Sequence, residues 1–171
     1  MTKSGFVCWA SFICVLMVGC SHPTPGTSST IASLTTASAT KGPTKPAATA
    51  DDDTWGTYLS EQGKLHGKDI EGHPYIYLIP GGDSVGAIAR RKNEAESIPM
   101  AIGPIMIPGS LLVLGGPDPQ QTNAFVVALP KAIKASALHG IVVLIVSDAS
   151  QKDAITKAYA LTGATLRFVA M

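Results

Sequence analysis

Short apolar runs alternate with stretches of helical periodicity through the C-terminal part of the chain. Four runs have the length of a β-strand: 75–79, 111–114, 141–146 and 165–169. The run 141–146 is apolar at every position, which is typical of a strand covered on both faces. The pattern therefore predicts four strands but not their order in the sheet.

The segments between these runs have helix-start and helix-stop signals. The first helix is predicted from about Ser84 to Ser97, with residues 90–92 largely outside. Its inward face is predicted to consist of small and aliphatic residues: Val85, Ile88, Ala89 and Ala95. The second helix is predicted to start at Asp118 and to continue, kinked or split at Pro130, to about Leu138.

A third helix is predicted from about Ser150 through Leu161, with Gly163 as its C-cap. The resulting β-α-β-α-β-α-β order predicts a small single α/β domain over 54–171, with helices packed on a mostly parallel or mixed sheet. The segment 55–72 is ambiguous, although Trp55, Tyr58 and Leu59 are compatible with a short helix.

The N-terminus has the layout of a secretory signal. Lys3 precedes an uncharged apolar run at 5–18, the basic n-region and h-region of such signals. As a helix this run would be roughly 21 Å long, which is short for a bilayer core of about 30 Å. A permanent transmembrane anchor is therefore the weaker interpretation.

The apolar run ends in Leu16-Met17-Val18-Gly19-Cys20, which resembles the lipobox of bacterial lipoproteins. The resemblance implies that 1–19 is a signal peptide cut between Gly19 and Cys20, and that the thiol of Cys20 carries a diacylglycerol. Ser21 in place of aspartate implies sorting to the outer membrane, on its periplasmic face. The inner membrane, the surface leaflet, an ordinary signal peptide and an uncleaved anchor remain alternatives.

The segment 20–53 is interpreted as the lipidated cysteine followed by a flexible tether. It is rich in Ser, Thr, Pro and Ala, and between Ser21 and Ala50 only Ile31 and Leu34 are bulky and apolar. Such a composition cannot bury enough apolar surface to offset the entropy of ordering it. Residues 51–53, three aspartates, are interpreted as a solvated boundary of the domain.

Charge and cysteine content exclude several classes of function. Thirteen basic residues nearly balance twelve acidic ones, and no basic block offers a nucleic acid an electrostatic footprint. All three cysteines, Cys8, Cys14 and Cys20, precede the domain, so it can form no internal disulfide and offers no thiolate ligand. His66 and His73 flank two acidic residues, but their spacing matches no recurrent metal site, and we expect neither a metal nor a cofactor.

The stretch 98–117 contains no charged residue, and its prolines and glycines rule out one long helix. We expect an extended apolar loop or edge hairpin. It either folds over the core or presents an exposed site for a protein partner. In the second case the contact residues are five aliphatic side chains: Met100, Ile102, Ile105, Met106 and Ile107.

The segment 82–86 matches G-x-S-x-G and lies between a predicted strand and a predicted helix, as a serine nucleophile does in α/β-hydrolases. Ser84 would need a histidine and an acid, and the chain offers only His139 and Asp118 in suitable order. The alternative is that Asp83 or Ser84 caps the helix. The same loop lacks the lysine and hydroxyl of a phosphate-binding loop.

These observations predict a membrane-anchored envelope lipoprotein with a non-enzymatic binding or assembly role, for example in a secretion or conjugation complex. Its partners would be the lipid bilayer, through acylated Cys20, and an envelope protein. Two alternatives remain: a periplasmic inhibitor or immunity lipoprotein, and a serine hydrolase that uses Ser84.

Overall fold

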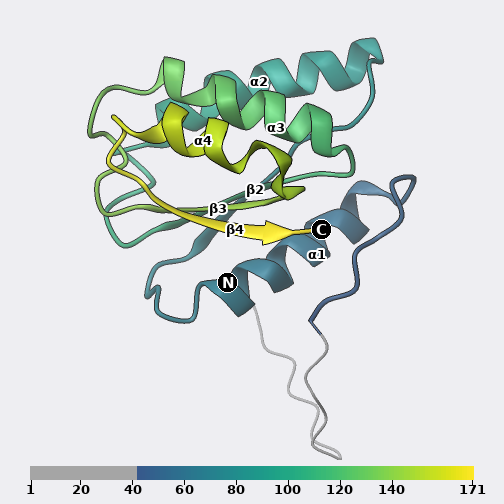
Figure 1. Cartoon of the computed structure of the whole chain (residues 1–171), viewed down its shortest axis with the longest axis horizontal. Coiled ribbons are helices and arrows are strands. Elements are labelled where there is room, and N and C mark those ends of the chain that lie inside the picture. The colour runs from purple at the N-terminus through teal and green to yellow at the C-terminus, as the bar shows by residue number, and fades with distance from the viewer. Residues whose placement is uncertain (1–41) are drawn as a thin grey trace, which may run out of the picture. The chain divides into compact units, whose positions relative to one another are not determined.

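The computed structural model describes residues 42–171 (Figure 1). The expected signal peptide, the cleavage site at Gly19 and the lipidated Cys20 lie outside the described residues. Within the described part of the chain, no helix has both the length and the hydropathy to cross a bilayer.

Four parallel strands form a single sheet, and their order in the sheet is their order in the chain. The strands are β1 (Pro74–Leu78), β2 (Leu111–Gly115), β3 (Val142–Ser147) and β4 (Thr165–Ala170). The predicted α/β class, with helices and strands alternating, is confirmed. Every residue of β2 and β3 is buried, as the uninterrupted apolar run in β3 predicted.

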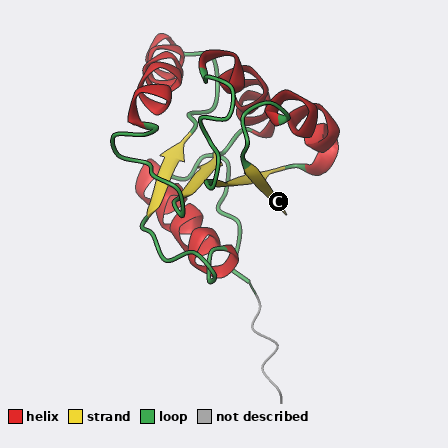
Figure 2. Ribbon diagram, turned by 90° about the vertical axis from the view of Figure 1, so that its left-hand side faces the viewer, coloured by secondary structure: helices red, strands yellow, loops and turns green. Residues whose placement is uncertain are grey.

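The two faces of the sheet are covered differently (Figure 2). The crossover helices α2 (Val85–Ala101), α3 (Pro119–Ala128) and α4 (Lys152–Tyr159) lie together on one face, and α1 (Asp52–His66) lies alone on the other. Two short 3₁₀ turns, η1 (Leu129–Ala132) and η2 (Ala149–Gln151), follow α3 and precede α4. Crossovers on one face follow from the right-handedness of each βαβ unit when the sheet grows in one direction.

Alternation along β2 and β3 produces two separate cores. Leu112 and Leu114 belong to the cluster under α2, α3 and α4, whereas Leu111 and Val113 belong to the cluster under α1. The α1 side of the second cluster is dominated by aromatic and aliphatic side chains: Trp55, Tyr58 and Leu59. Thus α1 is an integral part of the domain and shields the otherwise bare face of the sheet.

The domain begins before the predicted boundary at residue 54. Asp51 is the N-cap of α1, and its carboxylate accepts a hydrogen bond of 2.7 Å from the backbone N–H of Thr54. This hydrogen bond lowers the pKa of Asp51 below its ordinary value. The indole of Trp55 donates to the carbonyl of Ala47 at 3.1 Å, so residues just before α1 also contact it.

The predicted orientation of α2 is wrong in its first half. Val85 is 86% exposed and Ile88 is also exposed, whereas Arg91, expected outside, has a mostly buried side chain. The reason is that Arg91 donates to the carbonyls of Pro80 and Gly82, at 2.8 and 2.6 Å, and so faces the loop that precedes the helix. Only Ile98 of α2 is fully buried.

Two other predicted boundaries need correction. The helix starting at Asp118 ends at Ala128 and does not reach Leu138, because Pro130 cannot donate a backbone hydrogen bond and leads into η1. Conversely, α2 continues past Pro99 to Ala101. There the missing N–H of Pro99 removes one helical hydrogen bond, and only two helical residues follow the proline.

Candidate functional site

A parallel sheet has two chemically distinct ends, and every crossover loop lies at one of them. We call the end with the loops 79–84, 116–118 and 148–151 the carboxyl end, and the end with 67–73, 102–110, 137–141 and 160–164 the amino end. In open α/β sheets, ligands usually bind at the carboxyl end where the strand order reverses. This sheet has no such reversal, so its topology creates no crevice of that kind.

The loop after β1 is held rigidly at the carboxyl end. Besides its bonds to Pro80 and Gly82, Arg91 lies 3.6 Å from a carboxylate oxygen of Asp83. Asp83 also accepts a hydrogen bond of 3.0 Å from the side-chain amide of Gln121, in α3. Sequence reasoning missed Arg91, because a basic residue in a helix is usually solvated and nothing local indicates its buried partners.

Ser84 acts as the N-cap of α2, with its hydroxyl oxygen accepting a hydrogen bond of 3.1 Å from the N–H of Ala87. Asp118 caps α3 in the same way, accepting from the N–H groups of Gln120 and Gln121. His139 precedes β3 at the amino end, so the length of a strand, roughly 20 Å, separates it from Ser84. The structure therefore separates the candidate histidine from Ser84, although Ser84 and Asp118 line the same cleft.

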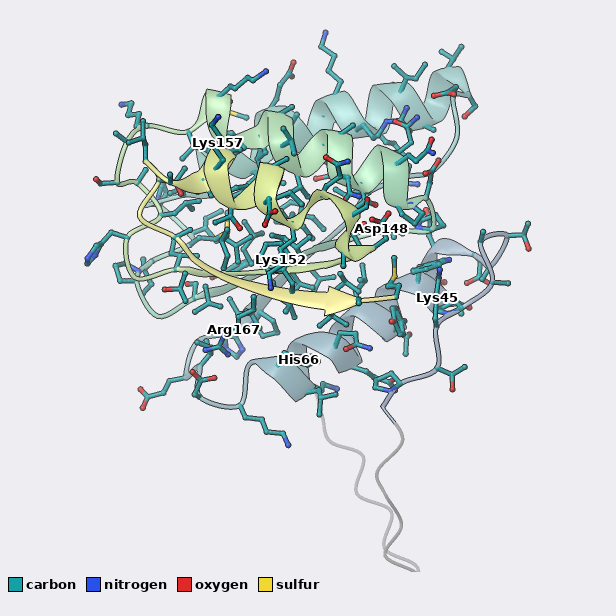
Figure 3. The ribbon with its side chains drawn as sticks, in the orientation of Figure 1. Lys45, His66, Asp148, Lys152, Lys157 and Arg167 are labelled. Carbon is teal, nitrogen blue, oxygen red and sulfur yellow. The ribbon has the colours of Figure 1, made fainter. Side chains whose placement is uncertain are left out.

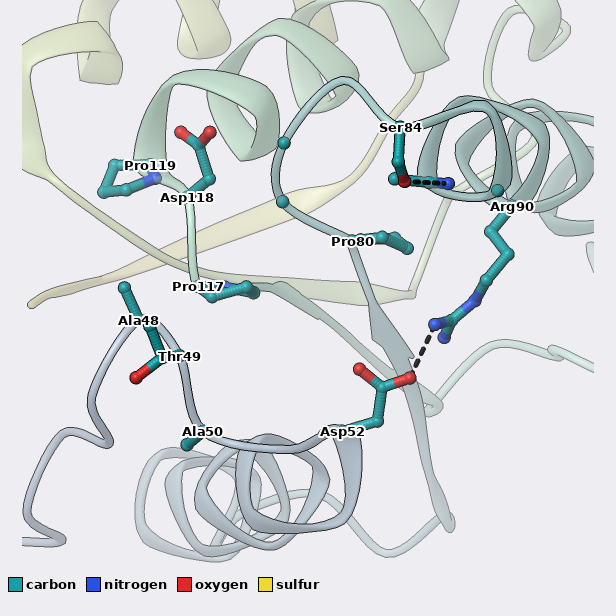
Figure 4. Close-up of a pocket in the computed structure, with 14 residues that line it drawn as sticks. Ala48, Thr49, Ala50, Asp52, Pro80, Ser84, Arg90, Pro117, Asp118 and Pro119 are labelled. Atoms are coloured by element: carbon teal, nitrogen blue, oxygen red, sulfur yellow. Dashed lines mark hydrogen bonds and ion pairs between the residues drawn. The ribbon is translucent and has the colours of Figure 1, made fainter.

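An open cleft of about 700 Å³ lies at the carboxyl ends of β1 and β2 (Figure 4). The start of α1, the first turns of α2 and the loops 80–82 and 117–119 line it. Arg90 and Asp52 both line the cleft and form an ion pair of 2.5 Å with each other. Among the described residues that line this cleft, the only cation is Arg90, which is already paired, and Asp118 adds a second carboxylate.

A second groove at the carboxyl end has a volume of about 580 Å³. One face of α3 and η1 forms one wall, and the turn after β3 forms the other. Asp148 stands at this turn (Figure 3) and accepts from the hydroxyl and the N–H of Ser150 and from the side-chain amide of Asn123. The bonds from Ser150 lower the pKa of Asp148, so its carboxylate is ionised at neutral pH.

The predicted partner-binding residues lie at the amino end, and most are exposed. Met100 is 70% exposed, Ile105 57% and Ile107 59%, while Ile102 is half-buried. The expectation that Met106 is an exposed contact residue is wrong, because only 1% of Met106 is exposed and its side chain belongs to the main core.

The stretch 98–117 is neither an extended loop nor an edge hairpin. It consists of the end of α2, a compact turn and β2. The N–H of Met106 bonds to the carbonyl of Ala101 at 2.9 Å, and its carbonyl accepts from Gly103 at 3.0 Å. This tight turn points the side chain of Met106 inward.

The loop with the two histidines is fixed by an arginine from the far edge of the sheet. Arg167 in β4 makes two hydrogen bonds, of 2.6 and 2.7 Å, to the carboxylate of Asp69, and it also donates to the carbonyl of His66 (Figure 3). This pairing lowers the pKa of Asp69 to about 2. Within residues 42–171, no three histidine, cysteine or acidic side chains are grouped as metal ligands.

The chain matches no family model, and no curated protein or solved structure matches it either. What this protein does is therefore inferred from its own sequence and its own geometry.

Proposed function

We propose that this protein is a lipid-anchored envelope lipoprotein whose α/β domain binds a protein partner and helps to assemble or stabilise an envelope complex. The proposed anchor is an acylated Cys20, and the proposed location is the periplasmic face of the outer membrane. The lipobox-like sequence Leu16–Cys20 supports the anchor. The exposed aliphatic side chains of Met100, Ile105 and Ile107 support the binding role.

The observation that carries the binding role is the exposure of three large aliphatic side chains close together in the chain. Met100, Ile105 and Ile107 each leave more than half of their surface in water. No charged residue lies between positions 98 and 117 to solvate this surface. We refer to Met100, Ile105 and Ile107 as the apolar patch.

Covering the apolar patch would be favourable, because burying one such side chain contributes about 1.5–3 kcal/mol. The absence of charged residues from the stretch 98–117 favours a partner surface that is itself apolar, because a charged group placed against these side chains would lose water without gaining an ion pair. The flexible thioether of Met100 adapts easily to the shape of such a surface.

The test is site-specific photo-crosslinking of the full-length protein in its native host. A photoreactive amino acid replaces Ile105 in one strain and Val85 in a second, matched strain. Val85 is equally apolar and even more exposed, but it lies at the carboxyl end. We expect a discrete crosslinked membrane protein from position 105 and none from position 85.

Equal crosslinking at both positions, or none at either, would contradict a specific partner at the amino end. A single soluble crosslinked protein would instead indicate the inhibitor or immunity role. The anchor is tested separately with Cys20→Ser, which should release the protein from membranes and remove the fatty acid from its intact mass. Retention at the membrane would contradict lipidation.

A further inference from the structure

The groove beside α3 combines an acid and a base at opposite ends of one helical face. Its α3–η1 wall consists of residues spaced three or four apart, as expected for one face of a helix: Gln120, Asn123, Ala124, Val127, Ala128 and Lys131. Asp148 stands at the Asn123 end. Lys131 is exposed at the other end, roughly 12 Å further along the helix axis.

Asn123 holds the carboxylate of Asp148 in place at one end of the groove. Only 5% of Asn123 is exposed, and its side-chain amide donates to Asp148 at 3.3 Å. Because Asn123 is buried, this hydrogen bond is shielded from water and fixes the direction in which the carboxylate points.

The middle of the groove is narrow and apolar. Ala124, Val127 and Ala128 present only short aliphatic side chains between the two charged ends. Asp148 can still accept further hydrogen bonds, because a carboxylate has about four acceptor positions and Ser150 and Asn123 use three. A fitting ligand therefore has a cationic donor, a small uncharged middle and an anion roughly 10–12 Å away.

We propose that this groove binds a free short peptide of about three small residues. Its terminal ammonium pairs with Asp148, and its terminal carboxylate pairs with Lys131. Three extended residues span about 10 Å, which matches the separation of the charged ends. Recognition of both termini excludes a segment within a longer chain. The proposal is independent of the apolar patch and of the lipid anchor.

The test is isothermal titration of the full-length protein, in detergent, with tri-alanine. We expect a dissociation constant on the order of 100 µM, given the small size of the ligand. N-acetyl-tri-alanine lacks the ammonium and tri-alanine amide lacks the carboxylate, so each should bind about tenfold more weakly. Absence of binding by tri-alanine at millimolar concentration would overturn the proposal.

Two variants assign the ends of the peptide. Lys131→Met should weaken tri-alanine about tenfold and leave the binding of tri-alanine amide unchanged. Asp148→Asn should weaken tri-alanine to a similar extent but spare the acetylated peptide, and asparagine can still accept the hydrogen bonds of Ser150 that shape the turn. The pattern of paired losses distinguishes direct contact from misfolding.

Lys157→Met is the matched control, because Lys157 is exposed on α4 and does not line the groove (Figure 3). We expect it to bind tri-alanine as the unmodified protein does. Equal weakening by Lys157→Met and Lys131→Met would show a general charge effect and overturn the assignment. So would unchanged binding by Lys131→Met.

Discussion

The two ends of the sheet differ in polarity although both consist of short connections. At the carboxyl end, hydroxyl or carboxylate oxygens of Ser84, Asp118 and Asp148 accept backbone hydrogen bonds at the starts of helical segments. At the amino end, the chain turns through Gly103, Gly109, Gly140 and Gly163, all with positive φ. The unpaired backbone N–H groups at a helix start need hydrogen-bond acceptors, and a helix often ends at a residue with positive φ. Because α2, α3 and α4 all start at the carboxyl end of the sheet, the acceptors gather there.

Most polar residues at the carboxyl end serve the fold, because their side chains hydrogen-bond to the backbone or to another side chain. Ser84 of the G-x-S-x-G segment is an example. Asn123 differs, because it keeps a buried acceptor without a partner among the described residues. In the turn 102–110 at the amino end, Gly103 and Gly109 adopt the positive φ angles. The neighbouring side chains of Ile105 and Ile107 are largely exposed.

The largest expected effect concerns the carboxyl end of β2. A Cβ atom on Gly116 would overlap the backbone carbonyl oxygen of Ile79, which cannot move without breaking the sheet. We expect Gly116→Ala to lower the free energy of unfolding by at least about 3 kcal/mol, measured by urea denaturation.

The matched control is Gly86→Ala, because a Cβ there meets no atom within 4 Å and the residue lies in α2. It should raise stability by about 0.5–1 kcal/mol. Similar stabilities for the two variants would contradict the close approach at Gly116.

The two methionines at the amino end should differ in how much their truncation lowers stability. Met106→Ala should cost about 2–3 kcal/mol of unfolding free energy, since it removes a fully buried side chain from the main core. Met100→Ala should leave stability within about 0.5 kcal/mol, because Met100 is mostly solvated. Thermal denaturation of both proteins measures the difference, and a larger loss for Met100→Ala would contradict their assigned positions.

A smaller effect is expected at the cap of α2. Ser84→Ala removes the acceptor for the N–H of Ala87 and should lower the free energy of unfolding by about 1 kcal/mol. Ser84→Asp keeps an acceptor at the same position and should restore most of this loss. If both variants have the stability of the unmodified protein, Ser84 is not an important cap.

The smallest effect concerns the ion pair near the amino end. Arg167→Leu should raise the pKa of Asp69 from about 2 towards its ordinary value of 3.8, as followed by NMR titration. Because the folded-state pKa is depressed, the stabilisation by this pair is present above about pH 4 and is lost as the pH falls towards 2.

Arg167→Lys keeps the charge but loses the two parallel hydrogen bonds, so its Asp69 pKa should lie between the other two values. An Asp69 pKa that does not change in Arg167→Leu would contradict the pairing.

Periodicity predicted the strands and the fold class well, because buried strands produce apolar runs that need no knowledge of their neighbours. It failed where long-range contacts decide the outcome. The inward position of Arg91 depends on carbonyls in a preceding loop, and the pairing of Arg167 with Asp69 joins residues 98 positions apart. Likewise, Met106 is buried because the turn 101–106 points its side chain inward. The run of apolar residues in this segment does not indicate which side chain points inward.

The sequence indicates candidate sites less well than the fold. Met100, Ile105 and Ile107 are exposed, as a binding surface requires, but their chemical type alone did not distinguish them from the buried Met106, and their role in binding stays a prediction. The groove beside α3 was missed. Asn123 and Lys131 look like ordinary helix residues in the sequence, and only the fold places Asp148 beside Asn123 on the same groove.

The matching order of strands in the sheet and in the chain has a consequence for biosynthesis. Each βαβ unit can dock on the unit already made, so the sheet can grow vectorially while the polypeptide is still emerging. Helix α1 is made first, but the core cluster that holds its aromatic side chains also contains residues of β2 and β3. This cluster is therefore complete only after β3 has been added, so the earliest helix belongs to a core that closes late.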